Sequence, residues 1–233
     1  MRNVFKIIVN LKLYKLLKRK AIGFDYGSLR TLNPISSVYG MDRGTPIDRY
    51  YIKKFIEKHS ALIHGITVEI GDKQYSKLFN SGITESIAAG INNGDEVVYL
   101  DLTNPDAEFM DKVDCLIATQ VLNFIYDFKK SIDGISKILK KNGTALITLA
   151  CLEQVSTYDK NEWGDYWRFT PDSAKKMFSE IFEDSNVEID VYGNLLTVTS
   201  ILHGLSAEEL KQEELNYKDP QYPLIIGVKV VKK

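Results

Sequence analysis

Short apolar runs alternate with stretches of helical periodicity along most of the chain. The strand-like runs cover residues 66–70, 97–100, 113–118, 144–149, 187–192 and 224–231, and a weaker run covers 85–89. Strands that alternate with helices form mainly parallel sheets with helices on both faces. The pattern therefore predicts an α/β fold in which the last two strands form an antiparallel edge.

Helical spacing is clearest in three segments, which cover residues 47–58, 127–140 and 171–182. The first segment presents three apolar residues on one face, Tyr51, Phe55 and Ile56. Gly143 follows the second segment and suits the left-handed position after a helix C-terminus. Pro171 opens the third segment at its first helical position, with Thr170 as its N-cap.

The composition fits one globular domain with a full core. The chain has 233 residues, of which 44% are hydrophobic and 26% are charged, and its formal net charge is -1. This balance argues against a nucleic-acid-binding protein. We expect residues 1–45 to form a basic N-terminal helix or arm with an irregular lead-in, and residues 46–233 to form the domain.

The two cysteines, Cys115 and Cys151, are far apart and do not have the spacing of metal ligands. Cys115 lies in an apolar run, which favours a buried free thiol. A chain without a disulfide framework fits a reducing cytoplasm. We expect no metal site, because no three of the histidines, cysteines and acids have metal-ligand spacing.

The first 20 residues contain seven Lys or Arg side chains and no acidic one. Apolar residues are interleaved with them, and the lysines interrupt the run too often for the core of a signal peptide. Two interpretations remain open. The segment packs on the domain or on a partner, or it forms a basic helix on the inner face of an anionic membrane.

Polar residues follow several of the predicted strands. In an open doubly wound sheet, ligands bind beyond the carboxyl ends of the strands. The residues at these positions are Glu69-Ile-Gly71-Asp72, Asp101-Leu102-Thr-Asn104, Thr119-Gln120 and Cys151-Leu-Glu153. We therefore expect the ligand site along this edge.

Three segments within roughly residues 65–150 carry a family resemblance. They are Val68-Glu-Ile-Gly71, the run from Asp114 to Asp127, and Ile138-Leu-Lys-Lys-Asn-Gly143. In order and spacing they resemble the type 11 group of class I S-adenosylmethionine-dependent methyltransferases. The resemblance implies a Rossmann-like sheet and S-adenosylmethionine as the cofactor.

The resemblance also implies roles for residues on the cofactor side. Glu69 would lie at the methionine end of the cofactor, and Gly71 would let the backbone approach it closely. Asp101 would lie near the adenine amino group, or else cap the next helix. The other cofactor-side candidates are Asp72, Leu102 and Gln120.

The chain departs from the family at two points. Gly71 is followed by the bulky Lys73, Gln74 and Tyr75 instead of further glycines. The acid that would bind the ribose hydroxyls should fall near residues 89–91, which contain no acid. A buried hydroxyl without its charged acceptor forgoes about 1.5–3 kcal/mol, or about 10- to 100-fold in affinity.

Three flanking segments, residues 41–51, 163–170 and 202–210, carry a second resemblance. They are similar to a bacterial group of methyltransferase-like proteins that are often encoded among glycosyltransferases and polysaccharide-assembly genes. This resemblance implies a glycan or polysaccharide-precursor acceptor. It also makes a glycosyltransferase a candidate partner for residues 1–20.

Segment 163–170 combines aromatic faces with charged groups, which suits contact with a sugar ring. The candidates for binding the acceptor are Arg43, Tyr166, Trp167 and Arg168. The candidates for the base that takes a proton from a hydroxyl are Asp165 and His203. The alternative for Arg168 is a structural salt bridge. A group of four charged residues forms part of the acceptor site or a lid, or else ties the N-terminal segment down: Asp42, Arg43, Asp48 and Arg49.

The leading hypothesis is a cytoplasmic S-adenosylmethionine-dependent methyltransferase that acts on a hydroxyl of a glycan or a polysaccharide precursor. A second hypothesis is a methyltransferase-fold protein that no longer methylates and serves as a binding or scaffold protein in glycan assembly. The incomplete glycine turn and the missing ribose acid motivate it. A third is a site rebuilt for a nucleotide sugar, because function resides in the site rather than in the fold.

Overall fold

The structure is a computed structural model that describes residues 27–91 and 96–233. The chain divides into two compact units, residues 1–33 and residues 34–233. The predictions for the basic segment 1–20 lie outside the described residues. Residues 34–45, which we expected in the lead-in, belong to the second unit, where the backbone N–H of Ile35 donates to the carbonyl of His203 (2.8 Å).

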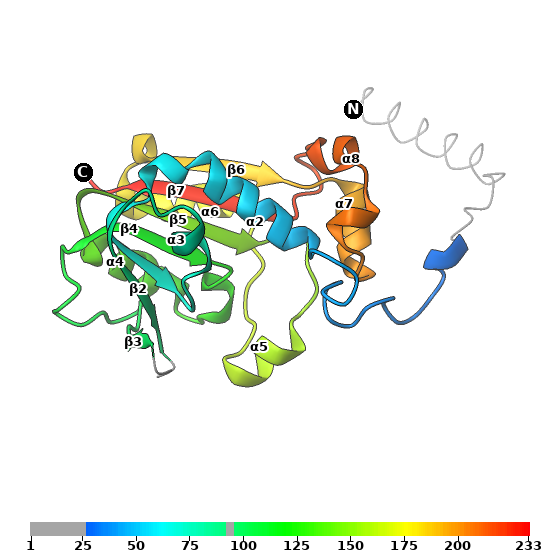
Figure 1. Cartoon of the computed structure of the whole chain (residues 1–233), viewed down its shortest axis with the longest axis horizontal. Helices are drawn as coiled ribbons and strands as arrows, with labels where there is room; N and C mark the ends of the chain where they lie inside the picture. The colour runs from blue at the N-terminus through cyan, green and yellow to red at the C-terminus, as the bar shows by residue number, and fades with distance from the viewer. Residues whose placement is uncertain (1–26, 92–95) are drawn as a thin grey trace, which may run out of the picture. The chain divides into compact units, whose positions relative to one another are not determined.

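One seven-stranded sheet forms the centre of the second unit, with the strand order β3-β2-β1-β4-β5-β7-β6 (Figure 1). The strands are β1 (His64–Ile70), β2 (Gly82–Gly90), β3 (Val97–Tyr99), β4 (Val113–Thr119), β5 (Leu139–Ala150), β6 (Val187–Tyr192) and β7 (Ile225–Val231). The first five are parallel, and β7 runs antiparallel to both β5 and β6. The predicted mostly parallel sheet with an antiparallel edge is confirmed.

Seven α-helices accompany the sheet among the described residues. They are α2 (Ile47–Lys58), α3 (Gln74–Leu78), α4 (Phe128–Ile138), α5 (Thr157–Glu162), α6 (Pro171–Phe182), α7 (Leu195–Leu202) and α8 (Gln212–Asn216). Single 3₁₀ turns cover Gly27–Leu29, Ser60–Leu62, Leu122–Phe124, Asp184–Asn186 and Ala207–Glu209. Helix α5 projects away from the sheet on the connection between β5 and α6 (Figure 1).

Each face of the sheet is buried in its own hydrophobic cluster. The cluster that contains α4 and α6 takes Leu116 and Ala118 from β4, and the cluster that contains α2 and α7 takes Cys115 and Ile117. Side chains of a strand alternate between the two faces, so one run of apolar residues serves both layers. The buried thiol predicted for Cys115 is confirmed, and burial raises its pKa to about 12.

Two of the three predicted helices, α2 and α6, have the predicted bounds. Helix α2 buries Tyr51, Phe55 and Ile56 as expected. Thr170 caps α6 by accepting a hydrogen bond from the N–H of Ser173 (3.2 Å), directly before Pro171.

The predicted end of the second helix is wrong. Helix α4 stops at Ile138, and Leu139 is already extended with φ -67° and ψ 137°. Asn142, rather than Gly143, has the left-handed backbone, with φ 65°. The reason is that residues 139–144 join the sheet early, where β5 pairs irregularly with β4, so the chain needs no helix C-terminal glycine.

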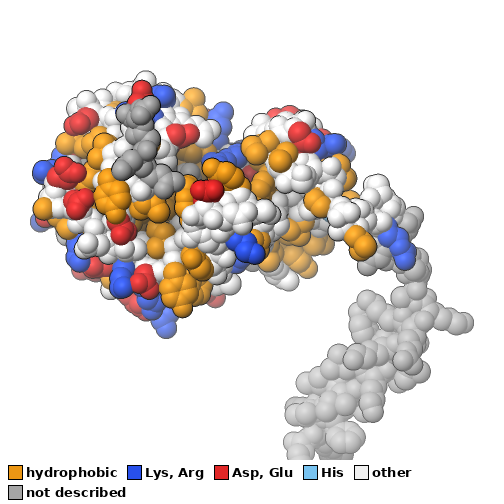
Figure 2. All heavy atoms as spheres, turned by 90° about the horizontal axis from the view of Figure 1, so that it is seen from below, with side chains coloured by type: hydrophobic (Ala, Val, Ile, Leu, Met, Phe, Trp, Pro, Cys, Tyr) orange, Lys and Arg blue, Asp and Glu red, His pale blue; other side chains and the backbone are white. Residues whose placement is uncertain are grey.

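Charged side chains of both signs are interspersed with apolar ones on the face of the molecule shown in Figure 2. This mixture agrees with the formal net charge of -1. Among the described residues, no helix combines the length and the apolar character that a bilayer crossing requires.

Candidate active site

The turn after β1 is the first part of the site. Gly71 has φ +100°, a conformation that L side chains rarely adopt, and a Cβ built there would meet nothing within 4 Å. Its N–H donates to the carbonyl of Ala89 at the end of β2 (2.9 Å). A glycine is therefore required by the backbone, and the space in front of it is open.

Glu69 is buried directly before this turn and has both carboxylate oxygens engaged. It accepts hydrogen bonds from the N–H groups of Tyr75 (2.9 Å) and Ser76 (2.8 Å), which begin the short helix α3. Burial raises the pKa of Glu69 in spite of these bonds. The structure thus gives Glu69 a capping role, which the sequence did not predict.

The other cofactor-side candidates lie in two turns. Asp72 accepts a hydrogen bond from the N–H of Gln74 (3.0 Å) in the turn after Gly71. Asp101 accepts two from Thr103, through the N–H and the hydroxyl (2.8 Å each). It therefore closes a turn, and no helix follows it directly. Leu102 is buried in the core beside α4.

Gln120, directly after β4, has a strained backbone. Its φ is +57°, which costs a residue other than glycine roughly 1–2 kcal/mol. Two hydrogen bonds hold its N–H, to the carbonyl (3.0 Å) and the hydroxyl (3.1 Å) of Thr148 on β5. This conformation directs the side chain to Glu153, whose Oε2 is 3.4 Å from Gln120 Nε2. Strain of this kind is concentrated at functional sites.

Two carboxyl groups interact electrostatically at this edge, and one of them accepts the hydrogen bond from Gln120. Glu153 follows β5, and Asp48 lies in the first turn of α2. Burial raises the pKa of Asp48, and burial together with the charge of Asp48 raises the pKa of Glu153 well above its usual value. Among the described residues, buried Asp48 Oδ1, Glu153 Oε1 and Gln120 Oε1 have no hydrogen-bond partner.

Arg49 connects the carboxyl pair with the turn after β1. Its positive charge lowers the pKa of both Asp48 and Glu153, although burial dominates in each case. On its other side it hydrogen-bonds the hydroxyl of Tyr75, the first buried side chain of α3. The acids that follow β1 and β5 are thus parts of one polar cluster at the carboxyl edge of the sheet.

Asp165 and Arg168 form a bidentate salt bridge. Arg168 Nη1 lies 2.5 Å from Asp165 Oδ1, and Nη2 lies 2.8 Å from Oδ2. Burial raises the pKa of Asp165, but the bonds from Arg168 and from the N–H of Ser156 outweigh burial and hold it below its usual value. A carboxylate that is engaged and stabilised in this way is a poor proton acceptor, so the geometry favours a structural role.

Arg168 also organises the segment after β5. It donates to the carbonyls of Glu153 (3.2 Å) and Gln154 (2.6 Å), and thereby fixes the backbone that carries the Glu153 side chain. The salt bridge that we left open as an alternative is confirmed. Arg168 still lies close enough to lower the pKa of Glu153.

Tyr166 and Trp167 belong to an aromatic group on the same segment. Trp167 Nε1 donates to the carbonyl of Tyr126 (3.2 Å), and its ring packs edge-on against Phe128. Tyr166 and Tyr126 are in edge contact, and about half or more of each is exposed. These two tyrosines therefore offer apolar ring surface to a ligand.

Arg43 and His203 make their contacts with residues outside the carboxyl pair. Arg43 forms an ion pair with Glu209, in which Nε lies 3.0 Å from Oε2, and so ties the lead-in to the 3₁₀ turn 207–209. His203 caps the C-terminus of α7. Among the described residues, no hydrogen bond or ion pair joins either of them to Asp48 or Glu153.

Sequence reasoning missed the carboxyl pair as a unit. Glu153 was recognised as following β5 but received no role, and Asp48 was considered only for an acceptor site or for tying down the lead-in. Tyr39 was also missed; its hydroxyl bonds Ser156, and its pKa is raised by burial and by Glu153. The position of Glu153 after a parallel strand was the available signal.

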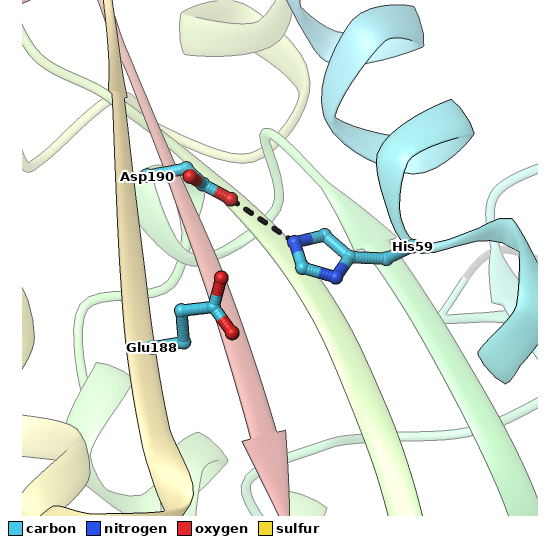
Figure 3. Close-up of side chains that lie close together, drawn as sticks. All are labelled: His59, Glu188 and Asp190. Carbon is cyan, nitrogen blue, oxygen red and sulfur yellow. Dashed lines mark hydrogen bonds and ion pairs between the residues drawn. The ribbon is translucent and has the colours of Figure 1, made fainter.

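A second cluster of ionisable groups lies at β6. The side chains of His59, Glu188 and Asp190 come within 4.8 Å of one another and could hold a metal ion by geometry (Figure 3). Lys58 already bonds both carboxylates, and Lys229 bonds Glu188. Because these cations compensate the acids, we interpret the cluster as an ion-pair network.

Two surface hollows lie away from the carboxyl edge. One is lined by α6 residues that include Lys176 and Glu180. The other is lined by residues that include Ser60 and Phe79, near the amino ends of β1 and β2. Neither includes a residue of the polar cluster.

No known family model and no curated protein sequence matches the chain. Solved structures do. A possible histamine N-methyltransferase from Thermotoga maritima has a TM-score of 0.53 at 11% identity, covering 80% of this chain and 91% of that one. The chain has the fold of class I methyltransferases.

Further methyltransferase structures support the same fold assignment. N-methyltransferase NodS from Bradyrhizobium japonicum, solved with S-adenosyl-L-homocysteine, has a TM-score of 0.50 at 9% identity, covering 85% of this chain and 94% of that one. A putative methyltransferase from Listeria monocytogenes has a TM-score of 0.51 at 10% identity, covering 80% and 97%. At these identities the likeness defines the fold alone.

Proposed function

We propose that this protein transfers a methyl group from S-adenosylmethionine to a hydroxyl of a glycan or polysaccharide precursor. The observation that carries the proposal is the polar cluster at the carboxyl edge of β1, β4 and β5, in a sheet of the class I methyltransferase type. That edge is where open parallel sheets bind their ligands.

The space and the backbone conformation at the turn after β1 fit a bound cofactor. The open space at Gly71, combined with its left-handed backbone, allows a ligand to approach the main chain. When bound, S-adenosylmethionine supplies an activated methyl group. Residues proposed to hold it are Gly71, Asp72, Asp101, Leu102 and Gln120, with Glu69 shaping the turn from behind through α3.

The acceptor assignment rests on the segment 163–170 and on the flank resemblance. Tyr166 and Trp167 supply aromatic surface, and Arg168 holds the backbone at Glu153. Sugar rings stack on such surfaces while polar groups bind their hydroxyls. Arg43 would act at the rim, through the lead-in. Asp165 and His203 stay candidates for the base, with the geometry of Asp165 unfavourable.

Where the protein acts is also part of the proposal. We place it in the cytoplasm, with residues 1–20 as the contact to a glycosyltransferase or to the inner face of the membrane. Seven basic residues without an acid support an anionic or acidic partner surface.

A second function is favoured by one observation. Both oxygens of Glu69 are bonded to the N–H groups of Tyr75 and Ser76, so they are already engaged when a cofactor arrives. This arrangement suits a methyltransferase-fold protein that binds glycan-assembly partners without methylating them.

Titration calorimetry with S-adenosylmethionine and S-adenosylhomocysteine decides between the two. We expect the full chain to bind both ligands with micromolar affinity, about -8 kcal/mol. Gly71→Arg should abolish binding, because its side chain enters the open space.

Gly71→Ala is the matched control for this variant. Both substitutions strain the left-handed backbone equally, so their losses of thermal stability should be similar. Binding should fall far less in the alanine variant. If the unchanged protein binds neither ligand at millimolar concentration, the enzyme assignment fails and the second function takes its place.

A further inference from the structure

The polar cluster contains more acceptor atoms than it can satisfy internally. The buried oxygens without a partner among the described residues include Asp48 Oδ1, Glu153 Oε1 and Gln120 Oε1, and the neighbouring Asn123 Oδ1 and Gln154 Oε1. A buried polar atom without a hydrogen bond costs about 1–3 kcal/mol. All five atoms are oxygens, so the complementary ligand is one that donates hydrogen bonds.

The charges around the pair define which donor fits. Burial raises the pKa of both Asp48 and Glu153, which favours their neutral forms and lessens the negative charge of the pair. Arg49 offsets that charge, and Asp165 offsets Arg168. The two guanidinium groups therefore oppose a cationic ligand such as an ammonium group, and the carboxyl groups oppose an anion.

The charged and titratable groups that face the pair come from several elements. Arg49 lies beside Asp48 on α2, and Arg168 and Asp165 lie on the segment before α6. Tyr39 faces Glu153 from the lead-in, and its hydroxyl bonds Ser156. Gln120 contributes a neutral amide that hydrogen-bonds Glu153.

We propose that Asp48 and Glu153 form the acceptor subsite, that their free oxygens bind hydroxyls of a neutral polyol, and that the carboxyl pair takes the proton of the hydroxyl that is methylated. This inference rests on the proposed methyl transfer. It assigns the role of the base to Asp48 and Glu153 instead of Asp165 or His203.

The step balances as an in-line substitution. The acceptor oxygen forms a bond to the methyl carbon while the carbon–sulfur bond breaks, and the sulfur keeps that bond's electron pair. The hydroxyl proton passes to the carboxylate of the pair. A carboxyl group whose pKa is raised toward neutrality is a better proton acceptor than an ordinary one, because it binds the proton more tightly.

Carboxyl ¹³C NMR on the full chain tests the proton-holding role. We expect one carboxyl of the pair in the unchanged protein to remain protonated well above the usual pKa of about 4. In Asp48→Asn the midpoint for Glu153 should fall, because a like charge has been removed. If Glu153 titrates at its usual pKa in the unchanged protein, the proposal is overturned, and this outcome does not depend on any variant.

Saturation-transfer NMR tests the ligand class with methyl α-D-glucopyranoside as a neutral probe and glucosamine as a cationic one. The unchanged protein should bind the glucoside in preference to glucosamine. Glu153→Gln and Asp48→Asn should each weaken glucoside binding by about tenfold or more, the loss expected for a charged hydrogen bond. Glu57→Gln, an exposed acid on α2, is the control and should bind normally.

Three results contradict the subsite: no glucoside binding by the unchanged protein, equal binding in all four proteins, or preference for glucosamine. Calorimetry with S-adenosylmethionine on the same four proteins keeps the two proposals separate. If all four proteins bind S-adenosylmethionine with equal affinity, any loss of glucoside binding is due to the acceptor subsite. If the unchanged protein does not bind the cofactor, the proposed methyl transfer is wrong, and so is the proposed role of the pair as proton acceptor. In that case the glucoside experiment alone decides whether the polyol site exists.

Discussion

At the scale of single residues, neighbours decide what each buried acid can do. The guanidinium of Arg168 holds the pKa of Asp165 below its usual value, whereas burial and the charge of Asp48 raise the pKa of Glu153. Asp190 is a third case. Burial raises its pKa, but hydrogen bonds with His59 and Lys58 lower it to about 2. Asp165 and Asp190 are therefore held in the ionised form by their cationic partners, whereas the surroundings of Glu153 favour its protonated form.

Asp190→Asn should therefore destabilise the protein in a pH-dependent way. Its folded pKa of about 2 lies below the usual 3.8, so the stabilisation is fully present above pH 4 and is lost as the pH falls toward 2. We expect a loss of about 2 kcal/mol at pH 7. Urea denaturation at pH 7 and at lower pH measures the difference from the unchanged protein.

Glu188→Gln provides the comparison for Asp190. The Glu188 side chain is 41% exposed, so its ion pairs are screened by solvent and contribute less, under about 1 kcal/mol. A loss at pH 7 as large as that of Asp190→Asn, or one that does not diminish in acid, would show that packing rather than charge is responsible.

At the scale of elements, the local sequence predicts the first residue of a helix better than its last residue. Helix α6 begins as predicted, because Thr170 and Ser173 form a reciprocal capping box in front of Pro171. The end of α4 is set by strand pairing instead. Leu139 pairs with Val113 of β4, and this contact ends the helix before any glycine is reached.

Removal of the α6 cap tests the local signal. Thr170→Ala should lower the free energy of unfolding by about 1 kcal/mol, because the N–H of Ser173 loses its acceptor. Thr170→Ser keeps the hydroxyl and should stay close to the unchanged protein. Equal stability of the alanine and serine variants in urea denaturation would show that the capping hydroxyl contributes nothing.

At the scale of the whole molecule, α2 packs closely on the antiparallel end of the sheet. A Cβ on Gly227 in β7 would collide with the ring of Phe55, which is fully buried on α2. Glycine at this position lets the helix approach the strand. The same helix carries Asp48 and Arg49, so this packing also brings the first turn of α2 to the carboxyl edge.

Gly227→Ala should destabilise the protein by about 1–3 kcal/mol through overpacking. Phe55→Leu in the same chain should recover part of the loss, although alone it is destabilising. A double-mutant cycle by chemical denaturation measures this coupling. Gly90→Ala is the control, since its Cβ would make an ordinary 3.8 Å contact with Val97. Additive effects of the two substitutions would contradict the predicted contact.

The sequence by itself determined the fold of the second unit. Apolar runs in β4 and β5 are buried on both faces, and such runs between amphipathic helices define a parallel sheet. It also located the ligand edge, because the ends of parallel strands follow from the order of the elements. Gly71 and Gln120 could be identified as edge residues for this reason.

Only the tertiary structure decided how the polar residues combine. Asp48 and Glu153 are far apart in sequence, and the position of α2 brings Asp48 and Arg49 close enough for their charges to act on Glu153. The same holds for His59 and Asp190, whose spacing gives no metal-like or catalytic pattern. The physical reason is that hydrophobic periodicity is a local property, whereas the pKa of a carboxyl depends on burial and on charges that distant segments bring within a few ångströms.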